Sequence, residues 1–369
     1  MQNKRYPLLI EGQKYSPQDQ WQEAFAPHVE ELSEALGFVE ARCLCLEDSH
    51  LAPSIMIRRR PERSGYAYIR APGTGNLHAP SCVFHSPHQN LNGLNSYNSN
   101  AMKETLEGTI CINLRKKLKQ SPDATHQLFD DAEQSKLRAF GLKGILHLIW
   151  SESRLNLWFD NVKCQRRLGM VNLAIRQVAA RIISQDTPLD RNLLLHAPIG
   201  SQQEQLNNDV INSSLAINSK TLLIAPLRPY NSKKYDSNVS KLPVVGNFGF
   251  SAIFIGTQHW EHFVKEYPNE VKLWKEGHTV IALARLATKN NGTFNIAQVR
   301  DLALMAVSEA WIPITSRSDL ANESALRAER VSFIKPLRYD APIDLEIPDF
   351  LMGLCRDKGN LGHSFCKPL

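Results

Sequence analysis

The spacing of apolar positions predicts helices in the first half of the chain. An N-terminal helix begins at Ser16-Pro17, a cap and first-turn pair, and ends before Gly37. Apolar residues recur at three- and four-residue intervals over 136–150 and 166–183, which predicts two more helices, and 154–159 fits a short strand between them. Helix, short strand and helix in this order fit either a winged-helix-like unit or an ordinary helical core layer.

Short β-like runs and polar loops surround these helices. Residues 54–58 and 66–70 are predicted strands in a segment that also carries Cys, His, Pro and Gly. The stretch 89–100 has Asn at five positions and is predicted to be a polar loop. Residues 200–220 and 231–241 are rich in Asn, Ser and Lys, so we expect loops there.

The second half of the chain carries a hairpin pattern. Residues 221–225 are a predicted strand, and the runs 279–288 and 293–299 flank Lys-Asn-Asn-Gly. Asn-Gly accepts the positive φ angles of a tight turn, so these two runs predict a β-hairpin. A helix over 321–328 then leads into a strand over 331–335.

These elements predict an α+β protein of three parts. We expect an N-terminal helix with a small zinc-bound module over 1–100, a helical middle domain over 101–200 and a mixed α/β domain over 201–369. The length of 369 residues fits two to three domains of about 150 residues. With 43% hydrophobic and 22% charged residues, the composition is globular and excludes wholesale disorder.

Hydropathy and cysteine content indicate the compartment. The longest apolar stretches, such as 250–256 and 279–286, are far shorter than a membrane span, so no membrane partner is expected. The first fifteen residues show no apolar segment of the kind that directs secretion. Seven cysteines in this length do not form a disulfide framework. We therefore expect a cytoplasmic protein with free or metal-bound thiols.

The positive charge is concentrated in one quarter of the chain. Residues 42–119 contain eleven basic and five acidic residues, an excess equal to the +6 of the whole protein. A localised basic region suits a polyanion, and nucleic acid is the commonest, although a solvated face would also carry such charge. The residues expected to contact DNA phosphates are Arg58, Arg59, Arg60, Arg115, Lys116, Lys117 and Lys119.

A cysteine and histidine cluster is the strongest chemical signal. Cys43 and Cys45 form a C-x-C pair, and His78 and Cys82 follow in an H-x-x-x-C pattern. Thiolate sulfur and imidazole nitrogen are the ligands of a tetrahedral structural zinc. The surrounding loops contain too few apolar residues for a core, so metal would stabilise them.

Alternatives to this zinc site remain. His85 is the substitute ligand if His78 points away. The cluster could instead be buried free thiols with unrelated histidines, or a catalytic zinc, which would need a nearby general base for its water.

The C-terminal part carries an acidic motif. A predicted helix with Glu323 and Glu329 precedes the strand that ends at Lys335, and Pro348-Asp349-Phe350 follows. An Asp after Pro at a strand start, with an upstream helix Glu, is one half of an Mg²⁺-dependent nuclease site, because hard carboxylate oxygens hold that ion. Pro-Asp-Phe is also often only a turn.

The motifs resemble a known family. The chain resembles an uncharacterised bacterial family of plasmids and integrative conjugative elements. The resemblance rests on five motifs in this order: Cys-Leu-Cys, Arg-Ala-Pro-Gly-Thr-Gly, His-x-x-x-Cys, Phe-Ile-Lys-Pro-Leu-Arg-Tyr-Asp and Pro-Asp-Phe. The resemblance covers residues 6–350 and implies no established activity. Its C-terminal part is similar to PD-(D/E)XK nucleases, whose Asp would correspond to Asp349.

The sequence departs from the nuclease pattern after Phe350. That superfamily places an acid-x-Lys element on a following strand, whereas Asp357 and Lys358 are adjacent here and lie in a Gly-rich tail. The nuclease-like domain is therefore expected to be incomplete. Lys335 is the candidate replacement for the missing lysine.

Three functions are compatible with these features. The first is a zinc-containing nucleic-acid-binding protein of a mobile element with a degenerate nuclease-like domain. The second is an active Mg²⁺-dependent DNA endonuclease that uses Asp349 with Glu323 or Glu329. The third is a structural adaptor of a conjugation apparatus that uses zinc only for folding.

Overall fold

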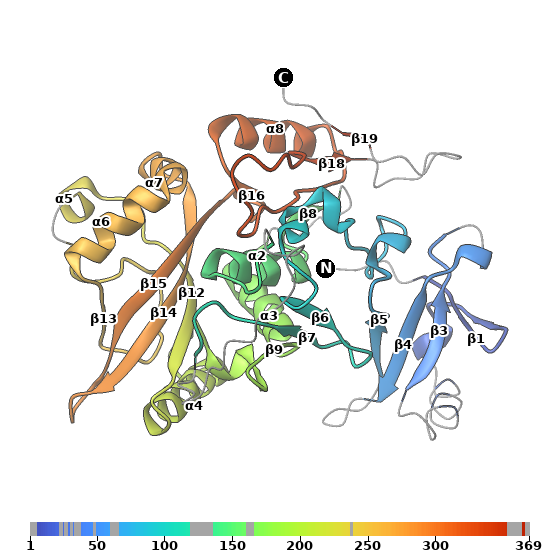
Figure 1. Cartoon of the computed structure of the whole chain (residues 1–369), viewed down its shortest axis with the longest axis horizontal. Helices are drawn as coiled ribbons and strands as arrows, with labels where there is room; N and C mark the ends of the chain where they lie inside the picture. Colours follow the sequence, from blue (N-terminus) through green and yellow to red (C-terminus); the bar gives the residue numbers. More distant parts are fainter. Residues whose placement is uncertain are drawn as a thin grey trace.

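The structure is a computed structural model of the chain. It describes residues 6–21, 25, 29, 32, 38–46, 49–59, 66–118, 136–159, 166–236, 239–352 and 364–365. These residues form a mixture of helices and sheets, which confirms the α+β class. An N-terminal sheet and a larger, later sheet lie at opposite ends of the molecule, with helices between them (Figure 1).

The larger sheet is built around one long hairpin. Its order is β11 (Leu193–Leu195), β12 (Lys220–Pro226), β14 (Thr279–Asn290), β15 (Asn295–Val307) and β13 (Ala252–Phe254), with β16 (Pro313–Ile314) also paired to β15. β14 and β15 are antiparallel, and Gly292 in their turn has φ of +93°. The predicted hairpin and the predicted strand over 221–225 are confirmed.

Helices cover both faces of this sheet. Leu222 and Ile224 of β12 share a core with α2 (Leu142–Glu152) and α3 (Leu168–Ala179). Leu223 and Ala225 point to the opposite face and share a core with other helices. Those helices are α4 (Gln202–Ala216), α6 (Thr257–Glu266) and α7 (Pro268–Lys275). Burial on both sides explains why these strands are continuously apolar.

The expected loop over 200–220 is wrong, because α4 occupies most of it. Ser201 caps this helix by accepting a hydrogen bond from the Glu204 amide at 3.3 Å, the Ser-x-x-Glu arrangement of a capping box. Its buried positions, Asn207, Val210, Ile211 and Ser214, follow helical spacing, but two of the four are polar. A count of apolar residues alone therefore missed this helix.

The helices predicted over 136–150 and 166–183 are present, with later starts, as α2 and α3. Both pack on the large sheet, as expected of a helical core layer. The strand between them is β8 (Leu157–Trp158), and it pairs with β17 (Phe333–Ile334). At the N-terminal helix, Phe25 and Val29 are buried, and most of its other positions lie outside the described residues.

Smaller sheets complete the fold. The N-terminal one has the order β2 (Gln13–Tyr15), β1 (Leu8–Ile10), β3 (Val39–Cys43), β4 (Ser54–Arg59) and β5 (Tyr66–Arg70). A second contains β10 (Thr187–Pro188), β9 (Ile182–Ser184), β7 (Ile110–Ile112) and β6 (Met102–Glu104), and a third contains β19 (Ser364–Phe365), β18 (Leu351–Met352), β17 and β8. The predicted strands over 54–58 and 66–70 are confirmed as β4 and β5.

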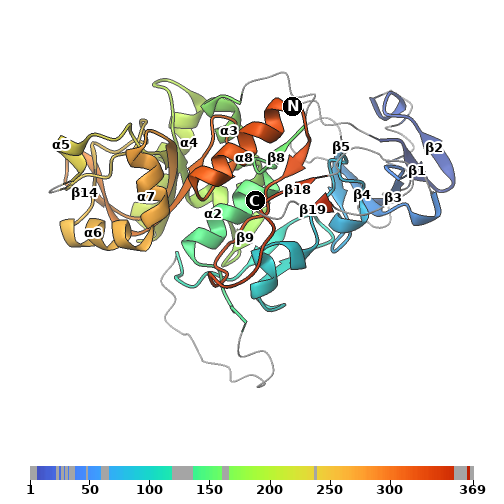
Figure 2. The ribbon, with the colours of Figure 1, turned by 90° about the horizontal axis from the view of Figure 1, so that it is seen from above.

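Short helices lie between the strands. They are η1 (Asp19–Trp21), η2 (Ser49–Leu51), η3 (Gly75–Leu77), η4 (Gln89–Leu91), η5 (Gly93–Ser96), η7 (Leu189–Asn192) and α5 (Ser232–Tyr235). The predicted helix over 321–328 is α8 (Arg317–Ala328), which Figure 2 shows beside β8 and β18. Among the described helices, none combines the length and the apolar character needed to cross a membrane.

Three of the hydrophobic cores contain most of the buried apolar residues. One core draws its residues from 6–82 and belongs to the N-terminal sheet. A second combines residues from 97–195 with residues from 222–339, because α2 and α3 pack on the large sheet. The third covers the other face of that sheet. The residues of the second core thus come from both sides of residue 200, and they begin at Tyr97.

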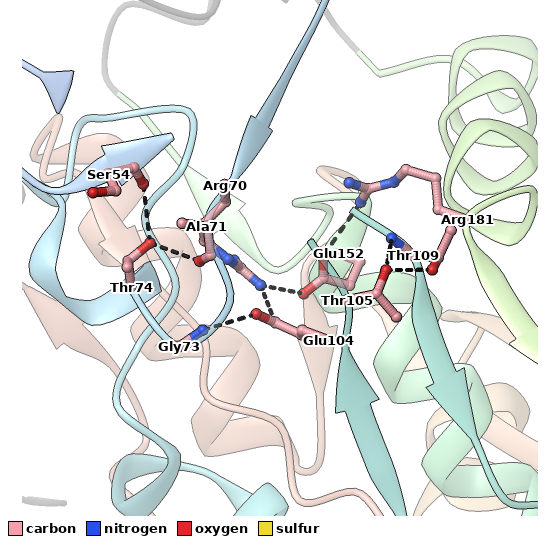
Figure 3. Close-up of polar contacts among 10 residues, drawn as sticks. All are labelled: Ser54, Arg70, Ala71, Gly73, Thr74, Glu104, Thr105, Thr109, Glu152 and Arg181. Atoms are coloured by element: carbon pink, nitrogen blue, oxygen red, sulfur yellow. Dashed lines mark hydrogen bonds and ion pairs between the residues drawn. The ribbon is translucent and has the colours of Figure 1, made fainter. Parts of the chain in front are cut away.

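An ion-pair network joins the N-terminal sheet to the rest (Figure 3). Arg70, at the end of β5, bonds the Glu104 carboxylate and lies 3.7 Å from Oε1 of Glu152 in α2. Glu152 also faces Arg181 at 3.4 Å, and Glu104 accepts the Gly73 amide at 3.2 Å. Arg70 and both carboxylates are largely buried, so they are screened less than surface pairs.

The segment that ends the Lys-Pro-Leu-Arg-Tyr-Asp motif caps α2. The Asp340 carboxylate accepts the Gly141 amide at 2.6 Å, the Gly144 amide at 3.0 Å and the Tyr97 hydroxyl at 2.6 Å. The N-cap residue itself is Gly141, which has no side chain to do this. Burial and the nearby Asp340 carboxylate raise the pKa of Tyr97, so its hydroxyl stays protonated and donates.

The neighbouring residue is fixed in the same way. The Tyr339 amide donates to Nδ1 of His147 at 2.8 Å. Burial lowers the pKa of His147 to about 3, so the ring is neutral and can accept this bond. The motif therefore serves to anchor the C-terminal segment against α2.

Asp340→Ala removes the cap of α2 and leaves the Tyr97 hydroxyl without its acceptor. We expect the free energy of unfolding to fall by about 2–4 kcal/mol, the sum of a lost cap and a lost buried hydrogen bond. Denaturant unfolding followed by tryptophan fluorescence measures it. Asp344→Ala, at an exposed position nearby, is the control, and equal stability of the two variants would contradict this role.

Candidate functional site

Two separate turns bring four ligand atoms together. Cys43 ends β3, and Cys45 lies in the turn that follows. His78 follows η3, and the Cys82 amide closes a tight turn by donating to the Ala79 carbonyl at 2.8 Å. The Sγ atoms of the three cysteines and a ring nitrogen of His78 all lie within 4.8 Å of one another. This is the set that the sequence predicted.

The distances suit a tetrahedral metal ion. The Cys43 and Cys82 sulfurs are 3.7 Å apart, and Nδ1 of His78 lies 3.6 Å from the sulfurs of both Cys45 and Cys82. Ligands at zinc bond lengths in a tetrahedron are separated by about 3.8 Å for two sulfurs and about 3.5 Å for sulfur and nitrogen. The cluster could therefore hold a metal ion without rearrangement.

Burial and electrostatics favour a cation in this cluster. All four side chains are buried, each at most 2% exposed. A hydrogen bond from Cys43 and further bonds from Cys82, His78 and the Ala79 amide hold the pKa of Cys45 far below its usual range. The hydrogen bond to Cys45 raises the pKa of Cys43, because it stabilises the protonated thiol, and repulsion between adjacent thiolates raises it further. A divalent cation would remove this repulsion and let all three thiols ionise.

Second contacts hold the cluster in place. His85 lies outside the ligand group, and its Nδ1 donates to the His78 carbonyl at 2.9 Å. Arg154, which follows α2, donates to the carbonyls of Cys82 and Val83, at 2.8 Å for Cys82. Burial lowers the pKa of Arg154 to about 10, so it keeps its charge at neutral pH. The ligand loop is thereby attached directly to the central helices.

The predicted catalytic residues have separate partners. Lys335 pairs with Asp319 at 2.7 Å and lies 3.8 Å from Asp349. Glu323 is fully buried and pairs with Arg327 at 2.6 Å. Glu329 is exposed at the end of α8. The structure therefore brings Lys335 and Asp349 together, whereas the ion-pair partner of Glu323 is Arg327.

Carboxylates do not form a second metal cluster among the residues described here. In that part of the chain, the cysteine and histidine group is the one set of three or more ligand side chains close enough to share an ion. Asp357 and Lys358 lie outside the described residues.

The basic residues fall in two places. Arg58 is partly exposed on β4 and lies 3.8 Å from Glu107. The side chain of Arg59, and the whole of Arg60 and Lys119, lie outside the described residues. Arg115, Lys116 and Lys117 are exposed in the segment after β7.

A further cation that the sequence did not single out joins this segment. Arg285 of β14 donates to the Lys117 carbonyl at 3.4 Å, and both Arg285 and Lys116 pair with Asp301. Asp301 thus pairs with two of these cations, Lys116 and Arg285, whereas Arg115 lies 4.0 Å from the Asp340 carboxylate. The signal was an arginine inside an otherwise apolar strand, and its ion pair with Asp301 explains its presence there.

The fold and the buried cluster define an α+β protein with an N-terminal Cys₃His module. A family described as "Protein of unknown function (DUF1173)" matches residues 18–360, and the chain belongs to this family. No curated protein and no solved structure matches the chain.

Purified protein should carry about one metal ion per chain, because a single four-ligand set is present. Cys82→Ser should lose the ion and lower the thermal midpoint of the N-terminal module, since the two turns that carry the ligands would no longer be linked by a metal. Elemental analysis and thermal unfolding measure the two effects. Cys111→Ser, at a half-buried free cysteine outside the cluster, is the matched control. Folded wild-type protein without metal would contradict the site.

Proposed function

We propose that the protein is a zinc-containing nucleic-acid-binding protein of a mobile genetic element, with DNA as its partner. Zinc is the metal best suited to three thiolates and one imidazole in a closed tetrahedral set. The absence of an open ligand position in such a set favours a structural role for the ion over a catalytic one.

The observation that carries the nucleic-acid proposal is the exposed cationic segment Arg115–Lys117 beside Arg285. Phosphates bind arginine and lysine without regard to base sequence, so this segment would supply affinity and not specificity. When no DNA is bound, the Asp301 carboxylate holds the side chains of Lys116 and Arg285 in place. Arg58, with Arg59 and Arg60, would extend the contact to the N-terminal sheet.

A double charge reversal, Lys116→Glu with Lys117→Glu, should weaken binding to duplex DNA. Two lost phosphate contacts should reduce the slope of log affinity against log salt by about 1.8. Fluorescence anisotropy at several salt concentrations measures it. Lys14→Glu with Arg191→Glu, at exposed positions elsewhere, is the control of equal charge change. If neither variant changes binding, or the wild type does not bind, an adaptor role without DNA becomes the better account.

We further propose that the C-terminal nuclease-like region is degenerate. Its lysine is held by Asp319, and Glu323 is held by Arg327, so neither is free to bind Mg²⁺ or water beside Asp349. Asp319, the other carboxylate at Lys335, already accepts the Lys335 ammonium and the Thr315 amide, which leaves Asp349 as the carboxylate for an ion. A single carboxylate binds Mg²⁺ weakly, because the ion loses its water reluctantly.

Supercoiled plasmid should therefore remain intact with Mg²⁺ or Mn²⁺, and Asp349→Ala should leave DNA binding unchanged. Gel electrophoresis and anisotropy measure the two. Metal-dependent nicking that disappears in Asp349→Ala would instead establish the endonuclease function.

A further inference from the structure

A pocket of about 290 Å³ lies between α5, α6 and α7, far along the chain from the metal cluster. Four aromatic side chains line it, namely Tyr230, Tyr235, Trp260 and Trp274. The two tryptophans are buried and the two tyrosines are partly exposed, so the tryptophans form the inner part. A pocket of this size and aromatic lining fits one planar ring system.

The rings are already arranged for stacking. Tyr235 stacks on Trp274 with centroids 5.2 Å apart and planes at 30°, and Tyr230 meets Trp274 edge-on at 4.9 Å. The indole nitrogen of Trp274 donates to the Arg228 carbonyl at 2.7 Å, which fixes the ring. A ligand would therefore meet ordered aromatic surfaces and lose little entropy to their ordering.

The charged side chains around the pocket indicate which charge the ligand carries. Lys275 lies 5.4 Å from the centre of the Tyr230 ring and 3.2 Å from the Asp236 carboxylate. This lysine already takes the position that a cationic ligand would use, so a second cation would be repelled. Lys265 and Lys275 suit a phosphate instead, and Glu261 and Asp236 suit an exocyclic amino group.

We propose that this pocket binds a nucleotide, with its base against the aromatic rings and its phosphate at Lys275. The base belongs either to a free nucleotide or to an unpaired position of a single strand, and the second source rests on the proposed nucleic-acid function. Stacking on tryptophan and tyrosine accepts any sequence, so the pocket would complement the phosphate contacts at Arg115–Lys117.

Titration of the full chain with adenosine 5′-monophosphate, followed by tryptophan fluorescence, tests this proposal. We expect quenching by the nucleotide and none by ribose 5-phosphate, which lacks the base. Tyr235→Ala should weaken binding about tenfold, and Tyr235→Phe should restore it because the stacking ring remains. Lys275→Ala should weaken it as well. Lys272→Ala, exposed on the same helix but outside the pocket, is the matched control.

An oligodeoxyadenylate of about ten nucleotides and a duplex of equal length separate the two sources. If only the oligonucleotide quenches the fluorescence, the bound base belongs to a single strand. If the mononucleotide quenches it, the pocket binds a free nucleotide. No quenching by either, or equal binding by wild type and Tyr235→Ala, overturns the proposal. If the protein binds the duplex but no ligand quenches its fluorescence, the pocket proposal is refuted and the nucleic-acid function stands. If it binds the mononucleotide but no duplex, the nucleic-acid function is refuted and the pocket proposal stands.

Discussion

The repulsion that three buried thiolates would exert on one another is the constraint on which the N-terminal module depends. Cys43, Cys45 and Cys82 meet at the centre of a small core, and only a cation lets all three ionise there. The site also joins segments more than thirty residues apart, since Cys45 and His78 are 33 positions from one another. The metal would thus add a link between two turns to the apolar contacts of this core.

Two arginines connect the N-terminal module to the rest of the molecule. Arg154 holds the carbonyl of a ligand residue, Cys82, and Arg70 holds the end of β5 against Glu104 and Glu152. Both arginines are largely buried, so removing their partners would leave costly unpaired charge. A module that loses its metal would therefore loosen its contact with α2.

The sequence predicted what depends on local pattern and ligand chemistry. Cys43, Cys45, His78 and Cys82 could be named because thiols and imidazoles have few other reasons to gather in a loop-rich segment. The hairpin of β14 and β15 followed from its Asn-Gly turn. In contrast, α4 was missed because its buried face includes Asn207 and Ser214, whose partners come from other elements.

Long-range contacts explain the remaining differences. The Arg154 contact, the Arg285 position and the aromatic pocket each join residues far apart in the sequence, and no spacing rule indicates such a contact. The same holds for Asp340, which caps a helix that begins almost 200 residues earlier. The acidic motif was predicted from residue type, but Lys335 and Glu323 are paired with neighbours that the fold supplies.

Hydrogen exchange with and without a strong zinc chelator tests most directly whether the metal holds the N-terminal module together. The account predicts that removal of metal raises exchange in β3, β4 and β5 while β14 and β15 stay protected, because the large sheet has its own cores. Unchanged exchange in β3–β5 after the ion is removed would contradict it.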